Sequence, residues 1–289
     1  MQFVIGPHTS IARGYRRAAE EAAAIGANTF QFFTRNPRGG NAKALDAADV
    51  AGLREVMAAH DFGPLLAHAP YTLNMASKTG KTREFAKMAF AEDLERLERL
   101  PCTLYNFHPG SHVGQGSETG IALILEILNA VMRPDQTTTV LLETMAGKGS
   151  EIGRSFEELA AIIAGCDHAE HLGVCLDTCH VYSAGYDIVG HLEETLSAFD
   201  RIVGMERLKA LHINDSKTPF ASHKDRHEQL GKGSIGLATF ERLAAHPKLS
   251  RLPMFLETPH DDYRAYGQEI AFMRAANEGR RTMSRAAEC

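Results

Sequence analysis

Eight short apolar runs recur along the chain at fairly even intervals. Each run is nearly continuous rather than alternating, which is typical of strands that are buried on both faces of a parallel sheet. The runs lie at residues 2–8, 28–34, 63–70, 103–110, 138–144, 173–180, 208–215 and 253–259.

The stretches between these runs have the period of amphipathic helices. The stretch 14–26 ends on Gly26, a common residue just past a helix, and Ser155 with Glu158 forms a capping box. Apolar residues at helical spacings in 82–100 include Phe85, Met88, Ala89 and Leu97. Eight alternations of strand and helix predict an α/β fold, a TIM (β/α)₈ barrel, which needs about 250 residues.

No linker interrupts this alternation, so residues 1–277 are expected to form a single barrel domain. Residues 278–289 lose the apolar periodicity and are expected to form a flexible C-terminal tail.

The composition of the 289 residues is that of an ordinary globular protein, with 44% hydrophobic and 23% charged residues. The sequence predicts neither a membrane span nor a signal peptide, and its five scattered cysteines form no CxxC pair. We therefore expect a cytoplasmic protein. A monomer is expected because nothing in the sequence suggests a dedicated interface.

Histidines and carboxylates lie at the ends of six consecutive runs and in the loop after the seventh. They are His68, His108, Glu143, Asp177, His180, His212, Asp225, His227 and Glu257. Strand ends of a barrel meet at one rim, where active sites lie. Any one of these residues alone is more often an ordinary polar side chain. Four buried carboxylates at one rim, however, would repel one another without cations.

The donor types indicate which cations would bind. Five imidazoles and four carboxylates without a thiolate suit Zn²⁺, Mn²⁺ or Fe²⁺ better than Mg²⁺ or Ca²⁺. Nine ligands exceed the capacity of one ion, so two or three ions with a bridging carboxylate are expected. Such ions would make the rim attractive to an anion, although the net charge of the chain is −5.

Basic residues and glycines also occur in the rim loops. The basic residues are Arg35, Arg38, Lys78, Lys81, Lys148, Lys217, Lys224, Arg226 and Lys232. About half of these are expected to be ordinary solvated side chains. The glycine-rich loops 146–153 and 231–236 either cradle phosphate through backbone N–H groups or are tight turns.

Four long strings contain most of these residues: "NFHPGSH" (106–112), "LLETMAGKGSEIG" (141–153), "GVCLDTCHVYSAGYD" (173–187) and "LHINDSKTPFASHKDRHEQLGKGSIG" (211–236). With them the chain resembles the endonuclease IV family of apurinic/apyrimidinic endonucleases over residues 2–275. The resemblance implies a xylose-isomerase-like TIM barrel with three Zn²⁺ per chain. Mn²⁺ or Fe²⁺ would suit the same donors at some positions.

The resemblance divides the nine ligands among three ions. The sets are His68, His108 and Glu143; Glu143, Asp177, His212 and Glu257; and His180, Asp225 and His227. It also implies that Glu143 and Glu257 are catalytic, with Glu143 bridging two ions and Glu257 beside the attacking water.

The implied activity belongs to DNA base-excision repair. The ions activate water to cleave the phosphodiester 5′ to an abasic site, leaving a 3′-hydroxyl and a 5′-deoxyribose phosphate. Double-stranded DNA with abasic sites or blocked 3′ ends would be the substrate. Arg38 and Tyr71 occupy the positions of the family's inserting side chains. Gly39 and Gly40 follow Arg38 where some members have bulkier residues, which leaves the depth of insertion open.

Two other functions remain as alternatives. A metal-dependent sugar isomerase or epimerase on the related barrel would use Glu143, Asp177, His212 and Glu257 but would not require the third set. A DNA-damage binder that has lost its chemistry would bind abasic DNA without turnover.

Overall fold

Eight parallel strands form the central sheet of the computed structural model, which describes residues 2–38 and 40–287, with side chains described through residue 279. The strands are β1 (Ile5–Pro7), β2 (Gln31–Phe33), β3 (Leu66–His68), β4 (Leu104–Phe107), β5 (Thr139–Glu143), β6 (Leu172–Asp177), β7 (Leu208–His212) and β10 (Met254–Leu256). Their order is β1-β10-β7-β6-β5-β4-β3-β2. Each strand lies in one of the eight apolar runs or begins within a residue of it, so the predicted strands are confirmed.

The sheet closes where its first and last strands meet. A parallel bridge joins His8, just after β1, to Gln31 at the start of β2. The backbone N–H of Thr9 donates to the carbonyl of Gln31 at 2.8 Å. The strands therefore form a barrel, and this narrow contact lies between β1 and β2.

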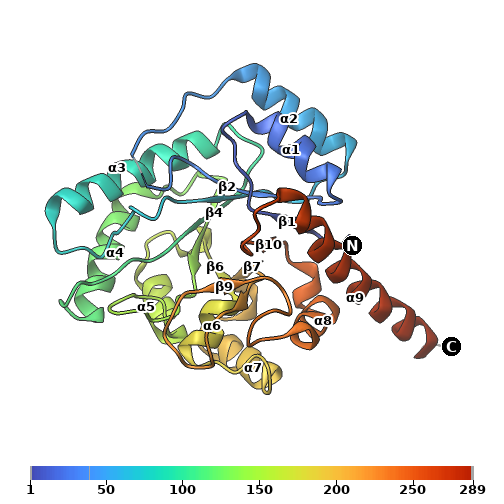
Figure 1. The fold of residues 1–289 in the computed structure, drawn as a ribbon. Coiled ribbons are helices and arrows are strands. Elements are labelled where there is room, and N and C mark those ends of the chain that lie inside the picture. The colour runs from blue at the N-terminus through green and yellow to red at the C-terminus, as the bar shows by residue number, and fades with distance from the viewer. Residues whose placement is uncertain (1, 39, 288–289) are drawn as a thin grey trace.

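Helices surround the strands (Figure 1). They are α1 (Tyr15–Ala24), α2 (Ala47–Ala59), α3 (Gly80–Leu97), α4 (Ser117–Val131), α5 (Phe156–Gly165), α6 (Thr178–Ala184), α7 (Leu192–Ile202), α8 (Leu237–Ala245) and α9 (Tyr266–Ala287), with 3₁₀ turns at Ala169–His171, Met205–Arg207, Leu249–Arg251 and Tyr263–Ala265. The predicted TIM barrel is confirmed.

Local sequence sets the helix boundaries and faces. The hydroxyl of Ser155 accepts from the N–H of Glu158 at 3.3 Å, so the predicted cap of α5 is confirmed. The reciprocal half of the predicted capping box differs, because the carboxylate of Glu158 accepts from the N–H groups of Gly153 and Arg154 rather than from that of Ser155. Of the apolar residues at helical spacings in α3, Met88 is 45% exposed, whereas Ala89 and Leu97 lie on the buried face together with Phe90.

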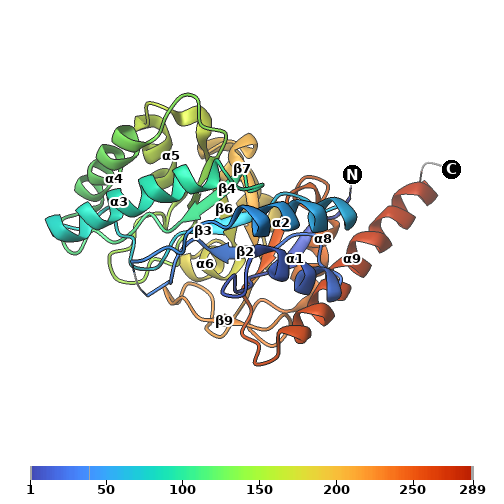
Figure 2. The ribbon, with the colours of Figure 1, turned by 90° about the horizontal axis from the view of Figure 1, so that it is seen from above.

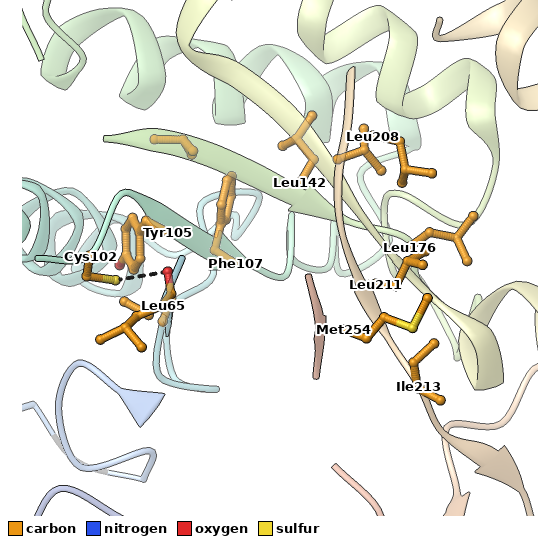
Figure 3. Close-up of a cluster of buried hydrophobic side chains, with 14 of the residues drawn as sticks. Leu65, Cys102, Tyr105, Phe107, Leu142, Leu176, Leu208, Leu211, Ile213 and Met254 are labelled. Atoms are coloured by element: carbon orange, nitrogen blue, oxygen red, sulfur yellow. Dashed lines mark hydrogen bonds between the residues drawn. The ribbon is translucent and has the colours of Figure 1, made fainter. Parts of the chain in front are cut away.

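Two groups of buried side chains form the core. The larger group lies between the strands and the helices, and Figure 3 shows part of it around Tyr105, Leu142 and Met254. The smaller group lies inside the barrel and consists of Leu66, Leu104, Leu141, Cys175, Ala210 and Phe255. These interior side chains come from six neighbouring strands and fill the space beneath the rim.

Two features of the chain depart from a simple barrel pattern. The short antiparallel strands β8 (Asp215–Ser216) and β9 (His227–Glu228) form a hairpin within the loop after β7. Helix α9 continues to Ala287 and extends from the barrel in both views (Figures 1 and 2). A flexible tail from residue 278 stays a prediction, and residues 288–289 lie outside the described residues.

Over the described ranges 2–38 and 40–287, no helix combines the length and apolar character that crossing a membrane requires.

Candidate metal centre

The period of the strands places the site residues above the interior core. Side chains two positions apart on a strand point to the same face. Accordingly, five interior residues each have a site residue two positions later along the chain. Four of these site residues were predicted to bind metal, and the fifth, Asn106, contacts a predicted ligand. The pairs are Leu66–His68, Leu104–Asn106, Leu141–Glu143, Ala210–His212 and Phe255–Glu257. Cys175 and Asp177 follow the same rule on β6.

The first group of possible ligands contains His68, His108 and Glu143, whose donor atoms all lie within 4.8 Å of one another. The Nε2 atoms of both histidines lie 3.2 Å from Oε2 of Glu143. Asn106 donates to the same carboxylate oxygen at 2.6 Å. Glu143 is fully buried, so this carboxylate depends on these neighbours for its polar contacts.

The second group contains Glu143, Asp177, His212 and Glu257. Nδ1 of His212 faces three carboxylates, at 3.1 Å from Glu143, 3.3 Å from Glu257 and 3.8 Å from Asp177. Asn214 connects two of them, because it donates to Asp177 at 2.7 Å and accepts from the N–H of Glu257 at 2.9 Å.

The third group contains His180, Asp225 and His227. The Nε2 atoms of both histidines lie 3.3 Å from Oδ1 of Asp225. The assignment of His180 to a strand is wrong, because β6 ends at Asp177 and His180 lies in the first turn of α6. Asp177 accepts from the N–H of His180 and thereby caps this helix.

Electrostatics couples the carboxylates to the imidazoles. Burial favours the neutral form of Glu143, but charged His212 and His108 hold the pKa of this carboxyl well below its usual range. Burial alone would lower the pKa of His180, whereas neighbouring carboxylates, Asp177 first among them, raise it well above its usual value. In the absence of metal, the negative carboxylates and the positive imidazolium groups thus stabilise one another across the site.

The donor set fits metal ions. Nε2 of His180 and Nε2 of His227 are buried and have no hydrogen-bond partner among the described residues. Unpaired buried nitrogen atoms are costly, and both face the carboxylate of Asp225. A divalent cation would use these lone pairs and neutralise the carboxylates. The three groups adjoin, since Glu143 belongs to two of them and Asp177 lies 3.7 Å from His227.

Sequence reasoning missed His8, which contacts Glu257, and several amide side chains around this site. Asn106, Asn214 and Gln31 are all buried and bond to the carboxylates. The strand period could have identified two of them as facing the barrel interior. Gln31 lies between Phe30 and Phe32, which face outward, and Asn106 lies two residues after the interior residue Leu104.

The residues expected to contact DNA lie on the rim loops. Arg38 follows β2 and is exposed, with its N–H bonded to Asn36. Tyr71 follows β3 and is 60% exposed, and its ring centroid lies 5.8 Å from that of His108. Gly39 lies outside the described residues. The structure thus places Tyr71 beside the first group, while DNA contact by Arg38 and Tyr71 stays a prediction.

The basic residues of the rim differ in their surroundings. Arg35 is buried, and its guanidinium lies 2.7 Å from the carboxylate of Asp93, so it is not free to meet a phosphate. The other eight basic residues of the set are exposed: Arg38, Lys78, Lys81, Lys148, Lys217, Lys224, Arg226 and Lys232.

The glycine-rich loop 231–236 encloses a carboxylate of the protein itself. Backbone N–H groups of Gly231, Gly233, Ile235 and Gly236 donate to buried Asp215 at 2.8–3.3 Å. A Cβ on Gly233 would lie 2.5 Å from Oδ1 of Asp215, which explains the glycine. These N–H groups are already used, so the loop does not offer them to phosphate.

A barrel whose rim brings nine imidazole and carboxylate side chains into three adjoining groups defines a metal-dependent barrel enzyme. The profile of the xylose isomerase-like TIM barrel family matches residues 19–276. A protein named probable endonuclease 4 from Akkermansia muciniphila is 58% identical over 270 residues, which cover 93% of this chain and 97% of that one. Another of the same name from Alkaliphilus oremlandii is 56% identical over 272 residues, which cover 94% and 96%.

Solved structures give the same result. Endonuclease IV from Thermus thermophilus superposes with a TM-score of 0.84 at 35% identity, covering 96% of this chain and 99% of that one. The chain belongs to the endonuclease IV family, which confirms the resemblance seen in the sequence. A D-tagatose 3-epimerase-like protein matches with a TM-score of 0.66 at 18% identity, which shows the shared barrel fold alone. The comparisons therefore favour the endonuclease over the sugar epimerase.

Proposed function

We propose that this chain hydrolyses the phosphodiester 5′ to an abasic site in double-stranded DNA, leaving a 3′-hydroxyl and a 5′-deoxyribose phosphate. The same centre would remove blocking groups from 3′ ends. The observation that carries the proposal is the third group, His180, Asp225 and His227, beside the two groups that share Glu143. A sugar isomerase would need only the two-ion part of this arrangement.

Three zinc ions are proposed, with Mn²⁺ or Fe²⁺ as possible occupants of some positions. His68, His108 and Glu143 would hold one ion, Glu143, Asp177, His212 and Glu257 the second, and His180, Asp225 and His227 the third. When bound, the ions would lower the pKa of the attacking water and stabilise the negative charge on the leaving oxygen.

Glu257 is proposed to orient the attacking water or to accept its proton. Its side chain is 13% exposed, whereas Glu143 and Asp177 are fully buried, so among these three carboxylates it is the one that solvent and substrate can reach. His8 and Gln31 both lie against its Oε1 atom. These contacts fix the carboxylate at the barrel closure with its second oxygen facing His212.

Recognition of the abasic site is assigned to the exposed rim. Tyr71 presents an aromatic ring beside the first metal group, and Arg38 an exposed guanidinium on the neighbouring loop. Opening a duplex costs less where a base is missing, because stacking is already lost there. We propose that Arg38 and Tyr71 enter the duplex at that point. The exposed lysines and arginines of the rim would contact the flanking phosphates.

The test uses an end-labelled duplex with a single abasic site, with an intact duplex as control. The expected product of the purified protein with zinc or manganese is a fragment that ends in a 3′-hydroxyl and is a primer for a DNA polymerase. No incision, or a fragment ending in a 3′ unsaturated aldehyde, would overturn the proposal.

We further propose that the enzyme acts as a monomer in the cytoplasm, which sedimentation and cell fractionation would test.

A further inference from the structure

Gln31 lies fully buried where the barrel closes, and its amide joins two members of the second metal group. Its Oε1 atom lies 2.6 Å from Nε2 of His212. Its Nε2 atom lies 2.5 Å from Oε1 of Glu257 and 2.8 Å from Nδ1 of His8.

The chemistry of these neighbours fixes the direction of each hydrogen bond. An ionised carboxylate only accepts, so the amide nitrogen of Gln31 must be the atom that faces Glu257. The amide oxygen then faces His212 and only accepts, which places a proton on Nε2 of His212. When the ring is neutral, as metal binding requires, Nδ1 therefore carries the lone pair, and this atom faces Glu143, Asp177 and Glu257.

Two other histidines of the site have the same kind of partner on their second nitrogen. Nδ1 of His68 lies 2.6 Å from the carbonyl of Ala69, and Nδ1 of His180 lies 2.8 Å from the carbonyl of Thr144. Each carbonyl holds a proton on Nδ1 and leaves Nε2 for a metal. His212 differs, because the partner that fixes its proton is a side chain and can be changed by mutation.

We propose that Gln31 is a positioning residue of the metal centre, which selects the Nδ1-binding tautomer of His212 and holds Glu257 in place through the same amide. This inference rests on the proposed metal centre. It gives a reason for an amide between Phe30 and Phe32 in a buried strand, where an unpaired amide would be destabilising.

The inference is tested with Gln31→Leu, which keeps much of the side-chain volume and removes the amide contacts with His212, Glu257 and His8. Gln136→Leu is the matched control. Gln136 is also a buried amide, but it bonds to the carbonyl of Thr138 and the N–H of Arg133, before β5 and away from the rim. Thermal unfolding of both metal-free variants identifies any general loss of stability.

The first readout is retention of zinc against a competing chelator. In Gln31→Leu we expect one class of ion to bind about 10- to 100-fold more weakly, as is usual when the partner of a ligating histidine is lost. The other ions, and all ions in Gln136→Leu, should be held as in the unchanged protein. The visible spectrum of the cobalt-substituted protein should also change in Gln31→Leu alone.

Unchanged zinc retention and an unchanged cobalt spectrum in a folded Gln31→Leu protein would overturn the inference. Should this variant fail to fold, Gln31→Met supplies the same test with a longer unbranched side chain. Failure of the proposed function is recognised separately, because the unchanged protein would then bind metal but leave abasic DNA intact.

Discussion

Glu143 lies within 3.3 Å of a nitrogen of four histidines: His68, His108, His180 and His212. Its position at the end of an apolar run made it recognisable in the sequence, since a carboxylate in that place needs a partner. The amides of Gln31 and Asn106 were not recognised, because an amide can satisfy itself with any nearby polar group. Only the folded barrel shows that the amide of Gln31 donates to Glu257 and the amide of Asn106 to Glu143.

Replacing Glu257 tests its catalytic role. Glu257→Gln keeps the shape but removes the charge that would orient water or accept its proton, so kcat should fall by about 100-fold or more. Binding of abasic DNA should persist. The measurement is single-turnover cleavage together with a binding titration, and Glu228→Gln, on the rim hairpin, is the control. Turnover equal to that of the control would remove Glu257 from the mechanism.

Tyr71 tests the assignment of lesion recognition. Tyr71→Ala should reduce the preference for abasic over intact duplex by about 10-fold, since stacking of one aromatic ring contributes about 1–3 kcal/mol. Its metal content should not change. The check is competitive binding of the two duplexes, with Met88→Ala as a variant at an exposed residue of α3. Undiminished preference would place recognition elsewhere on the rim.

At the scale of elements, strand ends were predicted better than the connections between them. His68, Glu143, Asp177 and His212 each end their strand, as the apolar runs indicated. The loop after β7 was not predictable in the same way. Its hairpin depends on backbone pairing, and the wrapping of 231–236 depends on backbone N–H groups that donate to the carboxylate of Asp215; no hydrophobic period relates these residues.

A buried network ties three elements together on one side of the barrel. Asp93 of α3 accepts hydrogen bonds from Thr34 and Arg35 after β2 and from Tyr105 of β4. Arg35 also donates to the carbonyl of Gly40, in the loop that contains Arg38. The network therefore supports the loop from beneath.

Asp93→Asn should strongly destabilise this network, because it removes the buried counter-charge of Arg35 and leaves only the exposed carboxylate of Glu92. We expect the free energy of unfolding to fall by about 3–5 kcal/mol. Glu92→Gln is a matched control on the same helix. Glu92 is largely exposed and also pairs with Arg35, so its loss should cost about 0–1 kcal/mol. Urea unfolding measures both, and equal effects would contradict the account.

For the whole molecule, the barrel followed from the sequence because eight similar units repeat the same burial pattern. The details of the closure were not predicted, since β1 and β2 are joined by an isolated bridge between His8 and Gln31 and by hydrogen bonds between Asn28 and Ile5 rather than by a regular ladder. Nor did the convergence of three metal groups follow from spacing alone. It required the parallel order of the strands, which brings residues far apart in sequence to one rim.

The charges of the site predict that the stability of the metal-free protein and the stabilisation added by zinc change in opposite directions as the pH rises. Lowered pKa values of Glu143 and Glu257 give stability that is present above about pH 4.3 and lost as the pH falls through the folded-state values. Raised pKa values of His108, His180 and His212 give stability that is complete below about pH 6.5 and lost as the pH rises through their folded-state values.

The metal-free protein should therefore be most stable near pH 5–6 and less stable at pH 8.5. Zinc requires neutral imidazoles, so its stabilising effect should grow over the same interval. Thermal unfolding with zinc and with a chelator, at pH 5.5 and 8.5, gives both quantities. An equal rise in Tm on adding zinc at the two pH values would contradict this description of the site.

The most direct test of the central claim is a titration of the metal-free protein with zinc, in which bound metal and incision of an abasic duplex are measured on the same samples. We expect full incision 5′ to the site only as binding approaches three ions per chain. Saturation at two ions with full incision, or three bound ions without incision, would contradict this expectation.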